Sequence, residues 1–422
     1  EKMVTFAKKG KMVVRLKGGD PLIFGRGGEE MQYLTKHQIP FEVIPGITSA
    51  IAVPSYAGIP LTHRNLSRSV AFVTGTLKKD EAQLDIPVAD TLVFLMAVTN
   101  LESIVEHILK LDRFSDDTPA ALINHGTLAE EEIHQGTLAT IVDIKNEMKV
   151  KTPAIFVVGD VVGLAEQFNW RSQLPLAGKR VVVLRDKEQA QSYVERFSEL
   201  GAETLVVPMI DIVPIKKEQK ELTKATLDAH NIIIFTSSNG VHVFMKTLKK
   251  NKYDVRSLSH ANIIAVGPKT AEALEKNGIV ADLVPKQHDV EGILEELPDQ
   301  LRGEKVLLPL AKKARDALEV GLQIRGAITK RVNLYNTKKP EIKAVPIFDN
   351  DHIIFTSPST AEHFFESGLY TNQAIHVYSI GKQSTEKIEE FYDGKIQTAK
   401  TATLNAVIDL VLSGVGGFVK FL

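Results

Sequence analysis

Residues 14–30 read VRLKGGDPLIFGRGGEE, and this stretch carries the clearest signal in the chain. An apolar strand over residues 12–16 is predicted to run into a Gly-Gly-Asp-Pro turn at 18–21. A second glycine cluster at 25–28 then opens a predicted helix with two acidic residues in its first turn. Such bare backbone lets a ligand approach peptide N–H and C=O groups closely. The stretch therefore indicates a ligand-binding turn, although a Gly-Asp-Pro turn alone is more often structural.

Composition excludes several classes of protein. The chain has 422 residues, which favours two or three domains. Its formal net charge is −1, without the basic surplus of a nucleic-acid-binding domain. It has no cysteine, which excludes disulfides, thiolate nucleophiles and Cys-ligated metal centres, and we predict no metal site. The longest apolar runs are strand-sized, and no secretory signal is recognisable, so we expect a cytoplasmic protein without membrane or nucleic-acid partners.

Short apolar runs alternate with helical patterns along the whole chain, which is typical of α/β architecture. A change of unit is expected close to residue 174, because an aromatic and proline-containing segment ends there and a new strand starts after Lys179. We therefore predict one domain over 1–174 and a second over 175–414. Strands are predicted at 12–16, 69–74, 91–96, 154–158, 180–184 and 232–236.

The second domain contains an internal repeat. Its residues 233–240, IIFTSSNG, resemble residues 353–360, IIFTSPST. Similarly, AVGPKTAE at 265–272 resembles SIGKQSTE at 379–386. The order of strand, hydroxyl-rich turn, helix, strand, glycine turn and helix is the same in both copies, so two similar lobes are predicted.

Two stretches, at 212–215 and 332–337, look like crossover strands that join these lobes. The lobe that we call lobe one would then be discontinuous, because the chain leaves it and returns. Lobe one is predicted to comprise 176–212 and 338–414, and lobe two to comprise 215–333.

Further motifs follow the first glycine turn in a fixed order. They are PGITSA at 45–50 after a predicted strand at 41–44, SYAGIPLTHR at 55–64, SVAFVTG at 69–75, TLVFLM at 91–96, NHGT at 124–127 and VVGDVV at 157–162. In this combination, residues 1 to about 170 resemble the tetrapyrrole methylases, most closely the uroporphyrinogen-III C-methyltransferases, which make precorrin-2. The resemblance implies that S-adenosylmethionine binds in a cleft between two α/β lobes, without a Rossmann glycine motif.

The same resemblance implies which residues contact S-adenosylmethionine. Adenosine and methionine offer amide, hydroxyl and carboxylate groups, which suit open backbone turns and short hydroxyl side chains. A methionine can pack against adenine or a thioether, although alone it would be read as a core residue. The implied cofactor-binding residues are Gly18, Gly19, Asp20, Ile23, Thr48, Ser49, Met96 and Gly126.

Arg26 and Arg64 are candidate substrate-binding residues of the first domain. The substrate of this family carries eight carboxylates, which guanidinium groups bind bidentately. Complete members of the family begin with further strands and an early Gly-x-Gly-Pro-Gly-Asp turn, which this sequence lacks before Gly18. We therefore expect the first lobe of this domain to be truncated and methylation by this polypeptide to be weak or absent. By resemblance alone, a homodimer through the methylase domain is expected.

Two hydroxyl-rich turns follow buried strands in the second domain, at 236–240 and 356–360. Free N–H groups and the helix dipole make each a candidate anion site, and ordinary N-capping is the alternative. Glycine turns at 267–270 and 381–384 form a second pair, and all four would face one another across a cleft between the lobes. The candidate substrate-binding residues are Thr236, Ser237, Ser238, Asn239, Thr270, Thr356 and Ser357.

Residues 176 to about 412 resemble the uroporphyrinogen-III synthases in VVVLR at 181–185, both hydroxyl turns, the 265–271 turn and Tyr335. That family closes linear hydroxymethylbilane into uroporphyrinogen III, with loss of water and inversion of the last pyrrole, and uses no cofactor. By resemblance, Tyr335 would donate a proton to the departing hydroxyl, with a packed crossover tyrosine as the alternative. Together the two resemblances imply a fused enzyme leading from hydroxymethylbilane through uroporphyrinogen III to precorrin-2, for sirohaem or cobalamin.

Two other functions stay open at this stage. One is a non-enzymatic two-lobe ligand-binding protein, against which the lack of a secretory signal weighs. The other is a nucleotide-dependent α/β enzyme, which would bind a nucleotide but not S-adenosylmethionine.

Overall fold

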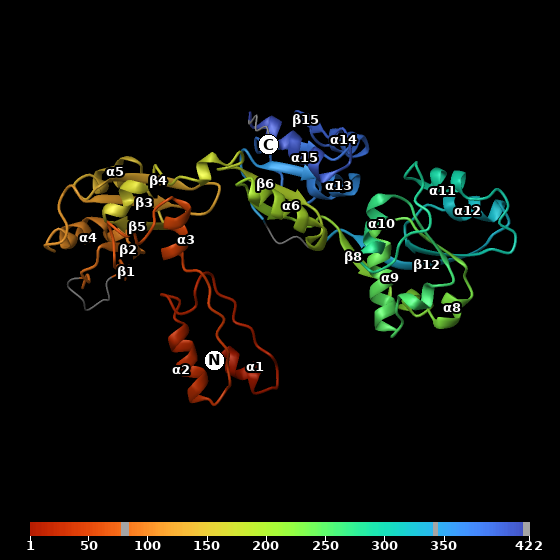
Figure 1. The fold of residues 1–422 in the computed structure, drawn as a ribbon, viewed down its shortest axis with the longest axis horizontal. Coiled ribbons are helices and arrows are strands. Elements are labelled where there is room, and N and C mark those ends of the chain that lie inside the picture. The colour runs from red at the N-terminus through yellow and green to blue at the C-terminus, as the bar shows by residue number, and fades with distance from the viewer. Residues whose placement is uncertain (77–83, 341–344, 417–422) are drawn as a thin grey trace.

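Three five-stranded sheets lie along the chain in the computed structural model, which describes residues 1–76, 84–340 and 345–416 (Figure 1). Each sheet carries helices and buries apolar residues on both of its faces. The α/β fold class predicted from the alternation of strands and helices is therefore confirmed. No helix of the described residues is long and apolar enough to cross a membrane.

The first sheet has the order β1-β2-β5-β3-β4, with β1 parallel to β2 and the other pairs antiparallel. Its central strands are continuous apolar runs because both faces are covered. The strands are β1 (Val70–Thr74), β2 (Thr91–Leu95), β3 (Pro119–Asn124), β4 (Glu132–Thr137) and β5 (Ala154–Val158). The helices are α3 (Ser49–Tyr56), η1 (Val98–Asn100), α4 (Leu101–Ile108), α5 (Ile141–Glu147) and η2 (Asp160–Leu164).

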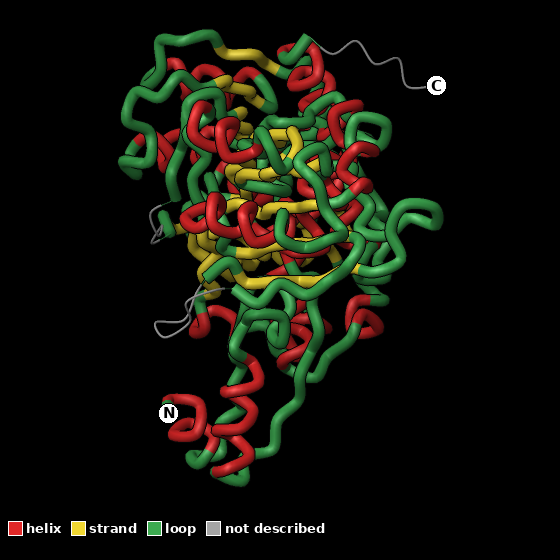
Figure 2. The backbone as a smooth tube through the Cα atoms, turned by 90° about the vertical axis from the view of Figure 1, so that its left-hand side faces the viewer, coloured by secondary structure: helices red, strands yellow, loops and turns green. Residues whose placement is uncertain are grey.

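Residues 1–48 extend away from the first sheet in both ribbon views (Figures 1 and 2). They contain α1 (Lys2–Ala7) and α2 (Gly27–Lys36), joined by extended chain. The strands predicted at 12–16 and 41–44 are wrong, because no described strand lies beside them to exchange backbone hydrogen bonds. Met12, Val14 and Leu16 are accordingly 94%, 82% and 84% exposed.

Lobe one holds a wholly parallel sheet with the order β15-β14-β13-β6-β7. Its strands come from two distant parts of the chain. They are β6 (Arg180–Leu184), β7 (Glu203–Val206), β13 (His352–Phe355), β14 (His376–Ser379) and β15 (Ile396–Thr398). The helices are η3 (Arg171–Gln173), which precedes the lobe, and α6 (Lys187–Glu199), α13 (Pro358–Phe365), α14 (Lys382–Glu389) and α15 (Leu404–Gly414).

Lobe two holds the sheet β10-β9-β11-β12-β8, in which only β8 is antiparallel to its neighbour. The strands are β8 (Asp211–Pro214), β9 (Ile232–Phe235), β10 (Asn262–Ala265), β11 (Lys305–Ala311) and β12 (Ile328–Lys338). The helices are α7 (Lys216–Gln219), α8 (Lys224–Asp228), α9 (Ser238–Lys250), η4 (Val255–Leu258), α10 (Pro268–Glu275), α11 (Val290–Glu296) and α12 (Ala317–Ile324).

The two connecting strands decide how the lobes face each other. β8 enters lobe two and pairs antiparallel with β12, which leaves it. Since β9 and β11 run parallel to β12, their carboxyl ends point back toward lobe one. The turns that follow these strands therefore lie at the edge of lobe two that faces lobe one, where ligands bind in parallel α/β sheets.

Candidate functional site

A cavity of about 210 Å³ lies between the two lobes, and turns from both of them form its wall. The hydroxyl turn of lobe two contributes Ser238 and Asn239, and the matching turn of lobe one contributes Thr356 and Ser357. The structure thus brings together two turns that are more than a hundred residues apart in sequence. The remaining lining residues are Arg185, Asp186, Gln189, Ile210, Ile212 and Thr360.

Both hydroxyl turns are also helix caps. The Ser237 hydroxyl accepts a hydrogen bond from the Gly240 amide at the start of α9. Ser357 caps α13 in the same way and forms a capping box with Thr360. The N-capping alternative and the anion-site interpretation are therefore compatible, because capping uses one amide while the others of the first turn stay directed outward.

The other predicted residues of the second domain do not line this cavity. Tyr335 is 5% exposed, and its hydroxyl lies 2.9 Å from the Ser237 hydroxyl. Burial raises the pKa of Tyr335 above its usual value, so the phenol stays neutral. In this conformation Tyr335 supports the turn behind Ser238 rather than facing the cavity. Thr270 is buried in α10, and Thr236 directly follows β9.

Direct hydrogen bonds join the lobes beside the cavity. The Gln189 amide donates to the side-chain oxygen of Asn239 over 2.5 Å. Arg185 donates to the Gln189 oxygen from Nε and Nη2, at 3.1 and 2.9 Å. At the start of α10, the Lys269 ammonium donates to the Ala402 carbonyl over 2.8 Å. Hydrogen bonds therefore join the lobes at Gln189 and at Lys269.

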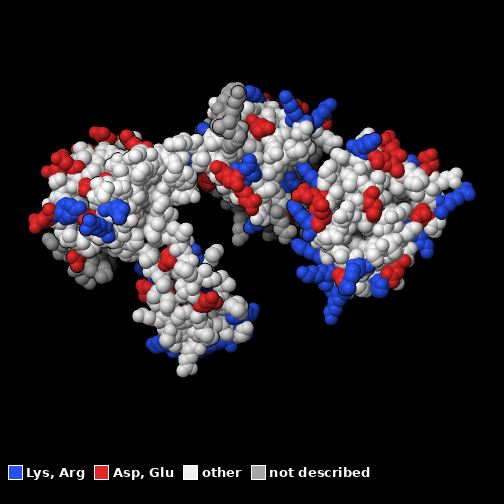
Figure 3. All heavy atoms as spheres, in the orientation of Figure 1, with Lys and Arg blue, Asp and Glu red and all other residues white. Residues whose placement is uncertain are grey.

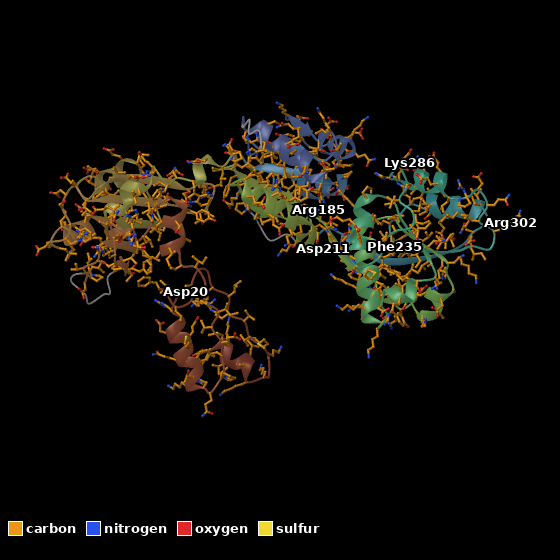
Figure 4. All side chains as sticks on the ribbon, viewed as in Figure 1. Asp20, Arg185, Asp211, Phe235, Lys286 and Arg302 are labelled. Atoms are coloured by element: carbon orange, nitrogen blue, oxygen red, sulfur yellow. The ribbon has the colours of Figure 1, made fainter. Side chains whose placement is uncertain are left out.

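Sequence reasoning missed Arg185 and Gln189. The available signal was position, since Arg185 directly follows β6 as the hydroxyl turns directly follow β9 and β13. Burial lowers the pKa of Lys269, and the positive charge of Arg185 lowers it further. Lys269 therefore lies within electrostatic reach of Arg185, and Arg185 lines the cavity with a positive charge that suits an anionic ligand. Figure 4 shows Arg185 on the side of lobe one that faces lobe two.

In the first domain, the turn that contains Gly19 and Asp20 packs against the turn before α3. The Asp20 carboxylate accepts hydrogen bonds from the amides of Leu22 and Gly46, at 2.8 and 3.1 Å. The hydrogen bond from the Gly46 amide holds the pKa of Asp20 below its usual value, and the weaker effect of the Leu22 amide acts in the same direction. Gly19 has φ +68, and a Cβ there would lie 3.4 Å from the Ile47 carbonyl. Asp20 therefore joins two of the predicted cofactor turns.

Thr48, Ser49 and Gly126 all lie at α3. Thr48 caps this helix and Ser49 is its first residue. A Cβ on Gly126 would lie 2.4 Å from the side chain of Val53 in the middle of the helix, so a larger residue would overpack this contact. Gly18 has open space beside its Cα, as a ligand-facing backbone needs.

The other predicted residues of this domain are exposed. Met96 follows β2 in the left-handed region, with φ +57, and is half exposed. Ile23 is 37% exposed. Arg26 occupies the N-cap position of α2 without a side-chain capping bond, and Arg64 lies in a turn between α3 and β1; both are exposed. Among the residues that the structure describes, no cluster of His, Asp and Glu could hold a metal ion.

The loop after Gly126 also reaches lobe one. Glu203 at the start of β7 accepts a hydrogen bond from the Ala129 amide over 2.8 Å. Arg171 donates to the carbonyls of Thr127 and Leu128 and pairs with Glu131 at 3.1 Å. The side chains of this ion pair are only 9% and 10% exposed. The loop that carries Gly126 is therefore fixed from the junction between the domains.

Two family models match the chain. "Uroporphyrinogen-III synthase HemD" matches residues 191–409, and "Tetrapyrrole (Corrin/Porphyrin) Methylases" matches residues 1–142. The chain is 35% identical to the porphyrin biosynthesis protein HemD of Ruminiclostridium josui, over 97% of this chain and 84% of the relative. It is 52% identical to the S-adenosyl-L-methionine-dependent uroporphyrinogen III methyltransferase of Methanosarcina barkeri, over 39% of this chain and 66% of that protein.

Among solved structures, the uroporphyrin-III-C-methyltransferase of Thermus thermophilus is similar, with 42% identity and a TM-score of 0.36. The similarity covers 40% of this chain and 72% of that one.

Proposed function

Since this chain belongs to the uroporphyrinogen-III synthase family, with a tetrapyrrole methylase domain fused before it, we propose that the interlobe cavity closes hydroxymethylbilane into uroporphyrinogen III. The observation that carries this proposal is the cavity itself, whose wall combines hydroxyl and amide groups from matching turns of both lobes. We take 1–174 as the methylase domain and 175–414 as the synthase domain.

The proposed substrate offers acetate and propionate side chains to this wall. Ser238, Thr356 and Ser357 would donate hydroxyl hydrogen bonds to carboxylates, and the amino ends of α9 and α13 add partial positive charge. Arg185 supplies a full positive charge at the same place. Holding several carboxylates at once would fold the linear bilane so that its two ends meet, which is the main requirement for ring closure.

Ring closure also needs a proton for the departing hydroxyl. We propose that Tyr335 serves this step, with Ser237 as the connection, because the two hydroxyls lie 2.9 Å apart and Ser238 follows directly at the cavity wall. The neutral phenol is the form that can donate a proton. The residues Thr236, Asn239 and Thr270 complete the proposed substrate-binding set.

For the methylase domain we propose that S-adenosylmethionine binds at Gly18, Gly19, Asp20, Ile23, Thr48, Ser49, Met96 and Gly126. The open backbone at Gly18 and the packed pair of turns joined by Asp20 support this fit. When bound, the cofactor would supply the methyl group that converts uroporphyrinogen III to precorrin-2, while Arg26 and Arg64 hold substrate carboxylates. A homodimer through this domain and a cytoplasmic location remain part of the proposal.

The test is turnover of hydroxymethylbilane by the full chain. We expect uroporphyrinogen III to form faster than the uninverted isomer that arises spontaneously, and Tyr335→Phe to lower kcat by about tenfold or more. Formation of only the spontaneous isomer, with tight binding of uroporphyrin, would instead indicate a two-lobe binding protein. Adding S-adenosylmethionine and following precorrin-2 absorbance tests the methylase domain separately.

A further inference from the structure

A short loop rich in positive charge follows β11 at the edge of lobe two that faces lobe one. Its residues 312–316 read KKARD. β11 runs parallel to β9 beside it, and the Pro309 carbonyl lies against Gly240 at the start of α9. Figure 4 shows Arg302, just before β11, at the opposite end of lobe two. The loop therefore lies at the same edge as the cavity turn that contains Ser238.

Hydrogen bonds hold this loop in place. The Lys312 amide donates to the Tyr335 carbonyl over 2.8 Å, and Tyr335 in turn contacts Ser237 through its hydroxyl. The Arg331 guanidinium donates to the Ala314 carbonyl over 2.9 Å and pairs with Asp316 over 2.6 Å. The Arg331 side chain is only 17% exposed. Because these contacts fix the loop beforehand, a ligand that binds it loses little chain entropy.

The three cationic side chains of the loop do not take part in these contacts. Lys312, Lys313 and Arg315 are exposed, and within residues 1–76, 84–340 and 345–416 none of them pairs with a carboxylate. The nearby carboxylates of Asp316 and Glu319 pair with Arg331 instead. Figure 3 shows Lys and Arg atoms gathered along the seam where the two lobes meet. The loop therefore offers a cluster of exposed positive charge at the edge of lobe two that carries the cavity turn.

We propose that Lys312, Lys313 and Arg315 bind carboxylates of the tetrapyrrole at the mouth of the interlobe cavity and favour ligands with acetate as well as propionate groups. This inference rests on the proposed function and deepens it. The hydroxyl turns hold one part of the ligand inside the cavity, and the loop holds carboxylates that extend beyond it. Ion pairs at such a rim act mainly on binding and its salt dependence, so the effect should fall on KM more than on kcat.

The decisive variant is K312Q/K313Q/R315Q in the full chain. Its matched control is K249Q/K250Q/K252Q, which removes equal charge at and just beyond the other end of α9, about 20 Å from the helix start at the cavity. We expect the loop variant to raise KM for hydroxymethylbilane by about tenfold and to flatten the rise of KM with salt. The control should behave like the parent.

Fluorescence titration with uroporphyrin III gives a second readout that does not depend on turnover. The loop variant should bind it about tenfold more weakly, with a smaller loss for coproporphyrin III, in which methyl groups replace the acetates. A parent-like KM and parent-like uroporphyrin affinity in the loop variant would overturn the inference, as would an equal loss in the control. If the parent binds uroporphyrin but does not cyclise the bilane, the proposed function fails while the loop remains testable by titration.

Discussion

At the scale of single residues, His352 is a buried imidazole without a neighbouring counter-charge strong enough to keep a proton. It is 1% exposed, stacks on His376 and lies 3.0 Å from the Tyr378 hydroxyl. Burial lowers the pKa of His352 from 6.5 to about 4, and the charge of the neighbouring His376 contributes to this shift. Between about pH 4 and pH 6.5, the His352 imidazole is therefore protonated in the unfolded chain and neutral in the native lobe.

It follows that lobe one loses stability as the pH falls from about 6.5 toward about 4, by up to about 3 kcal/mol. Above pH 6.5 the contribution is constant, because the imidazole is then neutral in both states. Hydrogen exchange of the β13 and β14 amides at pH 7.5 and 5.0 measures the change. In His352→Phe this pH dependence should largely disappear, and an unchanged slope would assign it to other groups.

Gly126 is one of the positions in the first domain where an added side chain would fit most tightly. A Cβ there would lie 2.4 and 2.7 Å from the two methyl groups of Val53, inside the core beneath α3. We expect Gly126→Ala to destabilise the domain by about 1–3 kcal/mol, because the added methyl overpacks this contact. The loss would appear in thermal unfolding and in S-adenosylhomocysteine affinity. Gly163→Ala is the control, since nothing lies within 4 Å of its Cβ position; an equal loss there would rule out the steric explanation.

At the scale of elements, the loop between β3 and β4 is fixed by one buried ion pair. Arg171 and Glu131 are almost fully buried, and Glu131 also accepts the Thr127 amide over 2.6 Å. Removing one partner of a buried pair leaves the other charge uncompensated. Arg171→Leu should therefore destabilise this loop by about 3 kcal/mol.

Faster hydrogen exchange across 125–131 would report that destabilisation. The exposed pair of Arg113 and Asp90 provides the comparison, because its side chains are 43% and 26% exposed. Arg113→Leu should change stability by less than about 1 kcal/mol. Similar exchange in both variants would mean that the buried pair contributes little.

At the scale of the whole molecule, polar contacts help to hold the two lobes together. Gln189 bonds to Asn239 on one side and Lys269 bonds to the Ala402 carbonyl on another. The covalent connections are the chain segments leading into β8 and out of β12. Polar contacts between domains are compatible with motion of one domain relative to the other.

The combined change Gln189→Ala and Lys269→Met should open the cavity. We expect a larger radius of gyration by small-angle X-ray scattering and a higher KM for hydroxymethylbilane. Lys276→Met is the control, since that side chain is 70% exposed and pairs with Glu272 on the same helix. A scattering curve identical to the parent would show that other contacts keep the lobes together.

The positions of several elements could be predicted from the sequence because their determinants are local. β9 and β13 are runs of apolar residues, and Ser237 and Ser357 follow them as helix caps. The same apolar pattern at 12–16 gave a wrong prediction, because a strand exists only where another strand pairs with it. Local sequence cannot report whether that neighbour is in place.

By itself, the sequence determined the α/β class, the repeated turns and, through ordered motifs, the family. Only the tertiary structure decided which of those turns share a cavity, that Arg185 and Gln189 belong to its wall, and that Tyr335 contacts Ser237. The physical reason is distance along the chain. Caps and apolar runs depend on neighbours within a few residues, whereas the bond from Gln189 to Asn239 joins residues fifty positions apart, on different lobes. Such a contact exists only once β8 and β12 have paired and set the two lobes face to face.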